Sequence, residues 1–87
     1  MAQVIGNAKG FKVIEMSLPE SVKAFGGGGI CDSCGRAAYT AYYIAVLNEV
    51  FCPYCYEEWH KLAERYEEDA EIEQRNFEVA KNMLRVR

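Results

Sequence analysis

The stretch Cys-Pro-Tyr-Cys at residues 52–55 decides how this 87-residue sequence is interpreted, because it places two thiols three positions apart. A second C-x-x-C pair, Cys31 and Cys34, precedes it, so the full pattern is C-x2-C-x17-C-x2-C. Two such pairs with a spacer of fifteen to twenty residues are typical of zinc sites. The pattern therefore predicts that two segments far apart in the chain meet at one metal ion.

Zinc takes four ligands at tetrahedral corners, and each C-x-x-C turn supplies two of them at close range. We predict one structural Zn²⁺ per chain, bound by Cys31, Cys34, Cys52 and Cys55. Gly35 fits this prediction, since the turn around a metal commonly needs a residue with positive φ beyond the second ligand. A closed site of four thiolates leaves no position for substrate. Because the sequence contains no other catalytic constellation, we predict that the protein is not an enzyme.

The CPYC stretch is also similar to the redox dithiol of glutaredoxins, and the similarity is confined to these four residues. A glutaredoxin-like fold would need further strands and a cis-proline loop after this helix. Here the 32 residues after Cys55 contain neither Pro nor Gly. A redox dithiol at Cys52 and Cys55, a disulfide pair and an iron site remain alternatives to zinc.

The first 25 residues predict one strand and one short helix. A strand is expected over residues 10–16, and Ser17 is a candidate N-cap for a helix over residues 18–25, with Pro19 near its first position. Four consecutive glycines at residues 26–29 then predict a flexible break before the cysteines.

The segment between the two cysteine pairs is rich in β-branched and aromatic residues. It predicts an antiparallel hairpin of residues 42–47 and 50–52, with a turn at Asn48 and Glu49. Because only one face of a strand can be buried, some of Tyr39, Tyr42 and Tyr43 are expected to stay outside.

A cysteine loop, a hairpin and a helix that carries the last two ligands occur in the same order as in treble-clef zinc fingers, and the 17-residue gap is similar to that of GATA-type fingers. The resemblance covers about residues 30–66 and depends on the four cysteines and Gly35. It implies an α+β fold: a small zinc-stabilised treble-clef-like domain with a zinc knuckle, a β-hairpin, a long C-terminal α-helix and a short N-terminal strand. Three segments follow: residues 1–29, the zinc module of residues 30–66, and a long helix over residues 53–87.

In GATA-type fingers the resemblance would imply recognition of DNA by the helix. Residues 57–73 instead contain eight acidic and two basic residues, which phosphates would repel. We therefore expect no nucleic-acid binding through this helix. A nucleic-acid-binding finger that uses Lys9, Lys12 and Lys23 remains an alternative.

A single helix over residues 53–87 would carry a heptad-like apolar stripe that begins at Trp59 and is interrupted by Glu73. Its distal half is expected to face water, so we predict that it packs on a second copy or on another protein through Tyr66, Phe77, Ala80 and Leu84. The alternative is a helix that bends back or frays after Glu68, in the acidic run. The predicted function is that of an adaptor or protein–protein interaction module that binds through the acidic helix.

The net charge and hydropathy of the sequence bear on membrane association and on the cellular compartment. The net charge of −3 gives no electrostatic reason to approach an anionic membrane, and no apolar run is long enough to span one. Without a recognisable secretory signal, the cytoplasm is the expected compartment. His60, the one histidine, is expected on the solvent side of the helix rather than as a ligand, and Trp59 is expected to fill the small core.

Overall fold

The structure is a computed structural model that describes residues 2–5, 9–25, 31–32, 34–36, 39–64 and 66–84 of the chain. The predicted glycine break at residues 26–29 and the basic residues at 85–87 lie outside the described residues. The strands are β1 (Gln3–Ile5), β2 (Val13–Ser17), β3 (Thr40–Ile44) and β4 (Glu49–Phe51). The helices are α1 (Leu18–Phe25), α2 (Pro53–Leu62), the short 3₁₀ helix η1 (Glu67–Asp69) and α3 (Ala70–Leu84). The predicted α+β class is confirmed.

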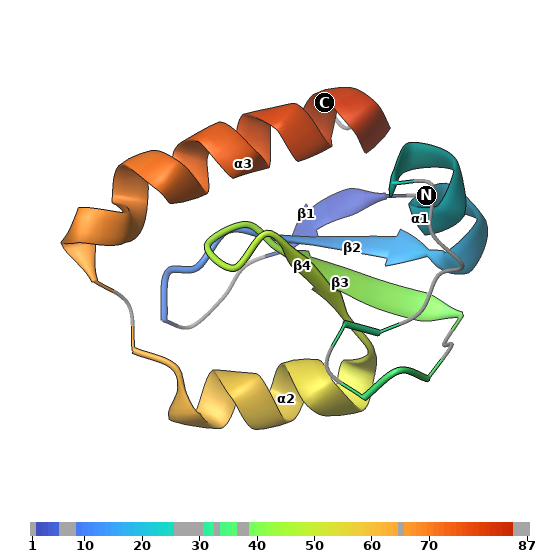
Figure 1. Cartoon of the computed structure of the whole chain (residues 1–87), viewed down its shortest axis with the longest axis horizontal. Coiled ribbons are helices and arrows are strands. Elements are labelled where there is room, and N and C mark those ends of the chain that lie inside the picture. The colour runs from blue at the N-terminus through green and yellow to red at the C-terminus, as the bar shows by residue number, and fades with distance from the viewer. Residues whose placement is uncertain are drawn as a thin grey trace.

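The four strands form one antiparallel sheet in the order β1-β2-β3-β4. Helices α1 and α3 lie on one face of this sheet and α2 lies on the other, which gives three layers (Figure 1). The predicted strand over residues 10–16 corresponds to β2, and the predicted hairpin corresponds to β3 and β4. Strand β1, which is only three residues long, was not predicted.

Strand alternation assigns the side chains to the two faces. On the α3 side, buried residues of β2 and β3 meet the inner face of α3. This core consists of Ile14, Met16, Ala41, Tyr43, Ala45, Phe77 and Ala80. On the α2 side, the smaller core consists of Cys31, Ile44, Phe51, Cys52 and Cys55. The cysteines therefore belong to a core of their own.

Helix α1 begins as the sequence predicts. The Glu20 backbone N–H donates to Ser17 Oγ at 3.4 Å, and the Ser17 backbone N–H donates to Glu20 Oε1 at 2.9 Å, which is a reciprocal capping box. These hydrogen bonds hold the pKa of the Glu20 carboxyl below its ordinary value. The pair fixes the sharp turn from β2 into α1.

The prediction of one continuous helix over residues 53–87 is wrong. Helix α2 ends at Leu62, and the chain is extended at Ala63 (ψ 140°) and at Tyr66 (ψ 137°) before η1 and α3. Lys9 Nζ donates to the Ala63 carbonyl oxygen at 2.8 Å and to the Lys61 carbonyl oxygen at 3.3 Å, so a cation caps the end of α2. The break lets α3 return across the opposite face of the sheet (Figure 1).

The expectation that the distal helix faces water is also wrong. Phe77 is 8% exposed and Ala80 is 1% exposed, because both pack on the sheet of their own chain, and Leu84 is packed against the same core. Tyr66 is exposed. Packing against a second copy or another protein stays a prediction, but Phe77 and Ala80 are not on the surface that it would use. None of the described helices is long and apolar enough to cross a membrane.

Candidate metal centre

The first two cysteines lie in a tight loop that leads into the hairpin. The Gly35 N–H donates to the Cys31 carbonyl oxygen at 2.9 Å, and the Cys31 N–H donates to the Arg36 carbonyl oxygen at 3.0 Å. Gly35 has φ +73°, as the sequence predicts for the residue after the second thiol. The Cys34 N–H points at Cys31 Sγ, 3.5 Å away. This turn brings both thiols to the same side of the loop.

The second pair lies where β4 passes into α2. Cys52 is the N-cap residue in an extended conformation (φ −72°, ψ 164°), Pro53 occupies the start of the helix, and Cys55 lies in the first turn. The Tyr56 N–H donates to the Cys52 carbonyl oxygen at 2.9 Å, which closes that turn. The helix start thus holds two thiols on the side that faces the sheet.

Asp32 attaches the cysteine loop to the edge of the sheet. Its backbone N–H donates to the Val50 carbonyl oxygen at 2.8 Å, and its Oδ2 accepts from the Val50 N–H, also at 2.8 Å. One residue therefore pairs with the outward-facing backbone groups of Val50 on the edge strand β4. Sequence reasoning missed this role, because an Asp between two cysteines gives no signal that it will contact a strand eighteen residues away.

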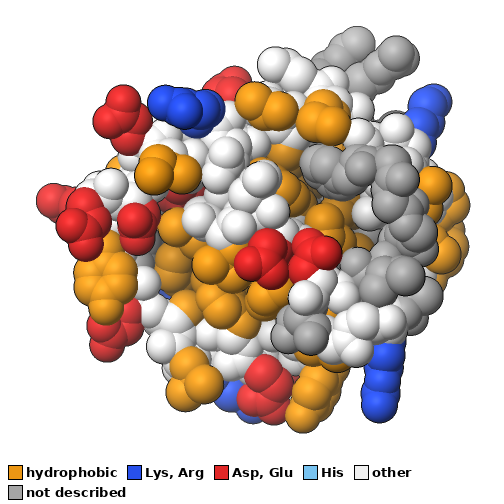
Figure 2. All heavy atoms as spheres, in the orientation of Figure 1, with side chains coloured by type: hydrophobic (Ala, Val, Ile, Leu, Met, Phe, Trp, Pro, Cys, Tyr) orange, Lys and Arg blue, Asp and Glu red, His pale blue; other side chains and the backbone are white. Residues whose placement is uncertain are grey.

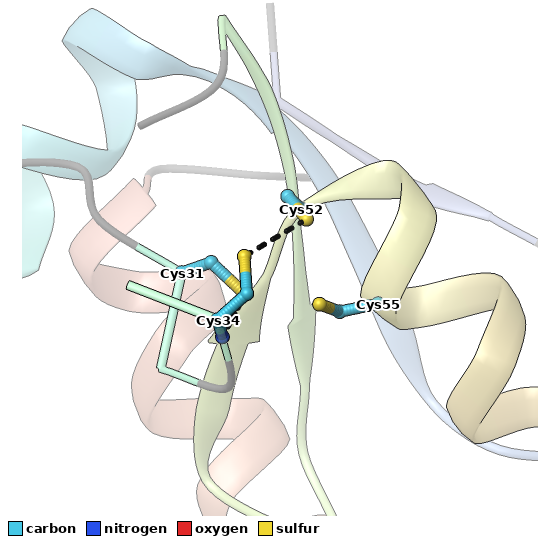
Figure 3. Close-up of side chains that lie close together, drawn as sticks. All are labelled: Cys31, Cys34, Cys52 and Cys55. Atoms are coloured by element: carbon cyan, nitrogen blue, oxygen red, sulfur yellow. Dashed lines mark hydrogen bonds between the residues drawn. The ribbon is translucent and has the colours of Figure 1, made fainter. Parts of the chain in front are cut away.

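The four Sγ atoms, of Cys31, Cys34, Cys52 and Cys55, all lie within 4.8 Å of one another (Figure 3). Cys34 Sγ and Cys52 Sγ are 3.7 Å apart, and these two atoms come from different C-x-x-C pairs. A regular tetrahedron with Zn–S bonds of about 2.3 Å has sulfur atoms about 3.8 Å apart. These four cysteines are not in disulfides, and the 3.7 Å separation is far longer than an S–S bond of about 2.05 Å. The prediction that these four side chains come together is confirmed.

Burial differs among the four thiols. Cys31 is 4% exposed, and Cys52 and Cys55 are each 9% exposed, whereas Cys34 is exposed. Ile44 and Phe51 belong to the same cluster, and Val46, Tyr56 and Trp59 pack against it. The donor set is therefore packed among apolar side chains and opens to solvent at Cys34.

Trp59 fills the space beside the thiols, as predicted. Its ring lies 4.7 Å from that of Phe11 and 6.5 Å from that of Phe51, between centroids. His60 is half-buried and stacks on Tyr56 at 6.1 Å, and it is not part of the thiol cluster. Its predicted place outside the ligand set is thus consistent with the geometry.

The hairpin tyrosines divide between core and surface, as expected. Tyr43 is 3% exposed, Tyr39 is 71% exposed and Tyr42 is half-buried. Tyr42 stacks on Tyr56 of α2 with 4.6 Å between ring centroids.

Comparison of the chain with protein-family models, with curated proteins and with solved structures found no match. The functional argument therefore depends on the chemistry of the chain itself.

Proposed function

We propose that the protein is a non-enzymatic zinc-binding protein with a treble-clef-like arrangement, and that it acts by binding another protein. The observation that carries the zinc part is the convergence of four thiol sulfurs within 4.8 Å of one another, at distances that no disulfide would have. Thiolate donors select soft or borderline metals, and tetrahedral sets of four sulfurs are typical of zinc and of iron–sulfur proteins.

The role proposed for the ion is structural. Cys31 and Cys34 would bind it from the loop, and Cys52 and Cys55 would bind it from the start of α2. When bound, zinc supplies the positive charge that lets four thiolates share one small core. The chain's own groups position the ligands, through the turn at Gly35 and the Asp32–Val50 pairing. Four thiolates complete the coordination of zinc, which supports a role other than catalysis.

The partner is proposed to be a protein with a basic surface. Acidic side chains gather over the connection between α2 and α3, at the left of the molecule in Figure 2. In the sequence, this connection and the start of α3 carry Glu64, Glu67, Glu68, Asp69 and Glu71, and all but Asp69 are exposed. A dense negative patch speeds encounter with a positive partner and disfavours nucleic acid.

Native mass spectrometry of protein purified without added metal tests the proposal. The expected result is one zinc per chain, and the same spectrum reports whether the chain forms a dimer. Serine substitution of Cys31 or of Cys55 should abolish zinc retention, and Co²⁺ added to the apoprotein should give the absorption bands of tetrahedral thiolate coordination. Metal-free protein with a dithiol at Cys52 and Cys55 that cycles with a redox buffer would overturn the zinc proposal in favour of redox chemistry.

A further inference from the structure

We propose that the sheet face beside α2 carries a binding site for a basic side chain of the partner protein, with arginine preferred over lysine, centred on the Glu15 carboxylate. This inference rests on the proposed function in one respect, that the partner is a protein. It goes further by assigning a site and the chemical group that the site receives, away from the acidic connection between α2 and α3.

The α2 face of the sheet is only partly covered. Helix α2 packs on β3 and β4, beside the thiol cluster. Further along the same face, alternation places Glu15, Ser17, Thr40 and Tyr42, and all four are half-buried rather than buried. The register pairs Glu15 with Tyr42 and Ser17 with Thr40, so the four side chains form a compact polar square. This end of the face is therefore open to a partner.

A shallow cavity of about 170 Å³ lies at this open end. It is lined by Glu15, Met16, Ser17, Tyr39 and Thr40. The ring of Tyr39 is 71% exposed. Sites for drug-sized ligands are about 300–1,000 Å³. The cavity therefore suits the head group of one side chain rather than a cofactor.

The charge of the cavity selects a cation. Glu15 is the one charged residue in its lining. Gln3 Nε2 donates to Glu15 Oε1 at 3.1 Å and the Tyr42 hydroxyl is hydrogen-bonded to the same carboxylate, while among the described residues no Lys or Arg forms an ion pair with Glu15. A half-buried carboxylate that has neutral neighbours keeps capacity to accept charge-assisted hydrogen bonds.

Aromatic rings beside the carboxylate favour a planar cation. The Tyr39 ring lines the cavity, and Tyr42, the cross-strand neighbour of Glu15, stacks on Tyr56 with 4.6 Å between ring centroids. Burial, followed by the charge of Glu15, raises the pKa of the Tyr42 hydroxyl above its ordinary value, so that ring stays neutral at pH 7. A guanidinium pairs with a carboxylate through two N–H groups and stacks on aromatic faces, which an ammonium cannot do as well.

The test is a chemical-shift titration of ¹⁵N-labelled full-length, metal-loaded protein. N-acetyl-arginine methylamide is the probe, N-acetyl-lysine methylamide tests the preference for a guanidinium, and the neutral isostere N-acetyl-citrulline methylamide tests the requirement for charge. We expect saturable shifts at the amides of residues 15–17 and 39–42 with the arginine probe. The lysine probe should bind more weakly and the citrulline probe should not saturate.

Three variants and one control locate the site. Glu15→Gln should weaken binding of the arginine probe about tenfold, because a charged hydrogen bond is lost. Tyr39→Ala should weaken it several-fold and Tyr39→Phe should restore it, since the phenyl ring keeps the stacking face. The matched control is Glu78→Gln, which removes an exposed carboxylate of α3 outside both the proposed site and the acidic connection, and should leave the binding constant unchanged.

The outcomes that overturn the proposal are specific. Equal binding of the arginine and citrulline probes, wild-type affinity in Glu15→Gln, or shifts confined to the acidic residues 64–71 would each reject the site. Absence of saturation would reject it as well. Zinc per chain is measured on the same samples, so lost binding with zinc retained concerns this site alone, whereas wild-type protein without zinc counts against the proposed function instead.

Discussion

The two faces of the sheet are packed by different chemistry. The α3 face is covered by side chains such as Ile14, Met16 and Phe77, together with polar contacts that are satisfied within the chain. The α2 face has a smaller core in which Ile44 and Phe51 pack with three buried cysteines, and the exposed Cys34 completes the cluster of four thiols. Apolar burial stabilises the first face without help, whereas four thiolates in contact would repel one another. We therefore expect metal binding to stabilise the α2 half of this 87-residue domain more than the α3 half.

Metal removal should have the largest effect and should affect the two faces unequally. Structural zinc contributes apparent binding free energies of about 10–16 kcal/mol in small zinc domains at pH 7. On chelation, we expect amides of residues 31–36 and 52–62 to lose most of their hydrogen-exchange protection. Amides of β2 and of α3 should keep a larger share of it, because their contacts lie on the other face.

Hydrogen exchange with peptide-level mass spectrometry measures this difference. Addition of Zn²⁺ back to the chelated protein is the control and should restore protection in both cysteine segments. An equal loss of protection in β2, α3 and the cysteine segments would show that the two faces unfold as one unit, and the comparison would then fail.

Phe77→Ala should destabilise the core between the sheet and α3, on the face opposite the thiols. Phe77 is 8% exposed, and the Nζ atoms of Lys12 and Lys81 lie 5.3 Å and 5.2 Å from its ring centroid. Truncation of a buried Phe typically costs about 3–5 kcal/mol. We expect a loss of this size in urea denaturation of the metal-loaded protein, with zinc per folded chain unchanged.

Val79→Ala is the matched control, because Val79 lies two residues away on the same helix and is 53% exposed. Its effect should stay within about 0.5 kcal/mol. A loss of zinc in folded Phe77→Ala protein would mean that the α3 face positions the thiols, contrary to the comparison.

The features that could be predicted from the sequence are those that neighbouring residues determine. The spacing of the cysteines, the positive φ of Gly35 and the capping of α1 by Ser17 each depend on a few neighbouring residues. The hairpin is displaced, with strands at residues 40–44 and 49–51 instead of 42–47 and 50–52, because the turn covers residues 45–48 and is longer than predicted; Asn48, which was predicted to lie in the turn, has positive φ (55°). Element ends of this kind depend on pairing partners elsewhere in the sheet.

The prediction of one continuous helix with a single apolar stripe was wrong. An amphipathic pattern does not show where a helix ends or which surface covers its apolar face. Trp59 and Phe77 fit the same heptad-like stripe, yet they face opposite sides of the sheet. The break near Ala63 contains no Gly or Pro, and one of its contacts, from Lys9, is 54 residues away. Glu73, which interrupts the stripe, is 1% exposed and accepts from the Lys12 N–H at 3.0 Å. Periodicity shows that a face is buried but not which surface buries it.

The smallest effect is expected at Tyr43, whose hydroxyl joins the hairpin turn to α3. It donates to Asn48 Oδ1 at 2.6 Å and lies 3.4 Å from the Asn76 carbonyl oxygen. Tyr43→Phe keeps the ring and leaves these acceptors without their donor, so we expect a loss of about 1 kcal/mol at pH 7.

The stability difference between wild type and Tyr43→Phe is expected to depend on pH. Burial raises the pKa of Tyr43 from 10.0 to about 12, so the folded state favours the neutral phenol. The stabilisation is complete below pH 10 and declines as the pH rises toward 12, because the unfolded chain ionises first. At about pH 11 this linkage removes about 1.4 kcal/mol from the wild type and nothing from Tyr43→Phe, so the two should become about equally stable there.

Urea denaturation at pH 7 and pH 11 measures both differences, with exposed Tyr39→Phe as the control. A constant difference between wild type and Tyr43→Phe at both pH values would show that Tyr43 ionises equally well in the folded protein, and that the α3 face is less tightly closed than its packing indicates.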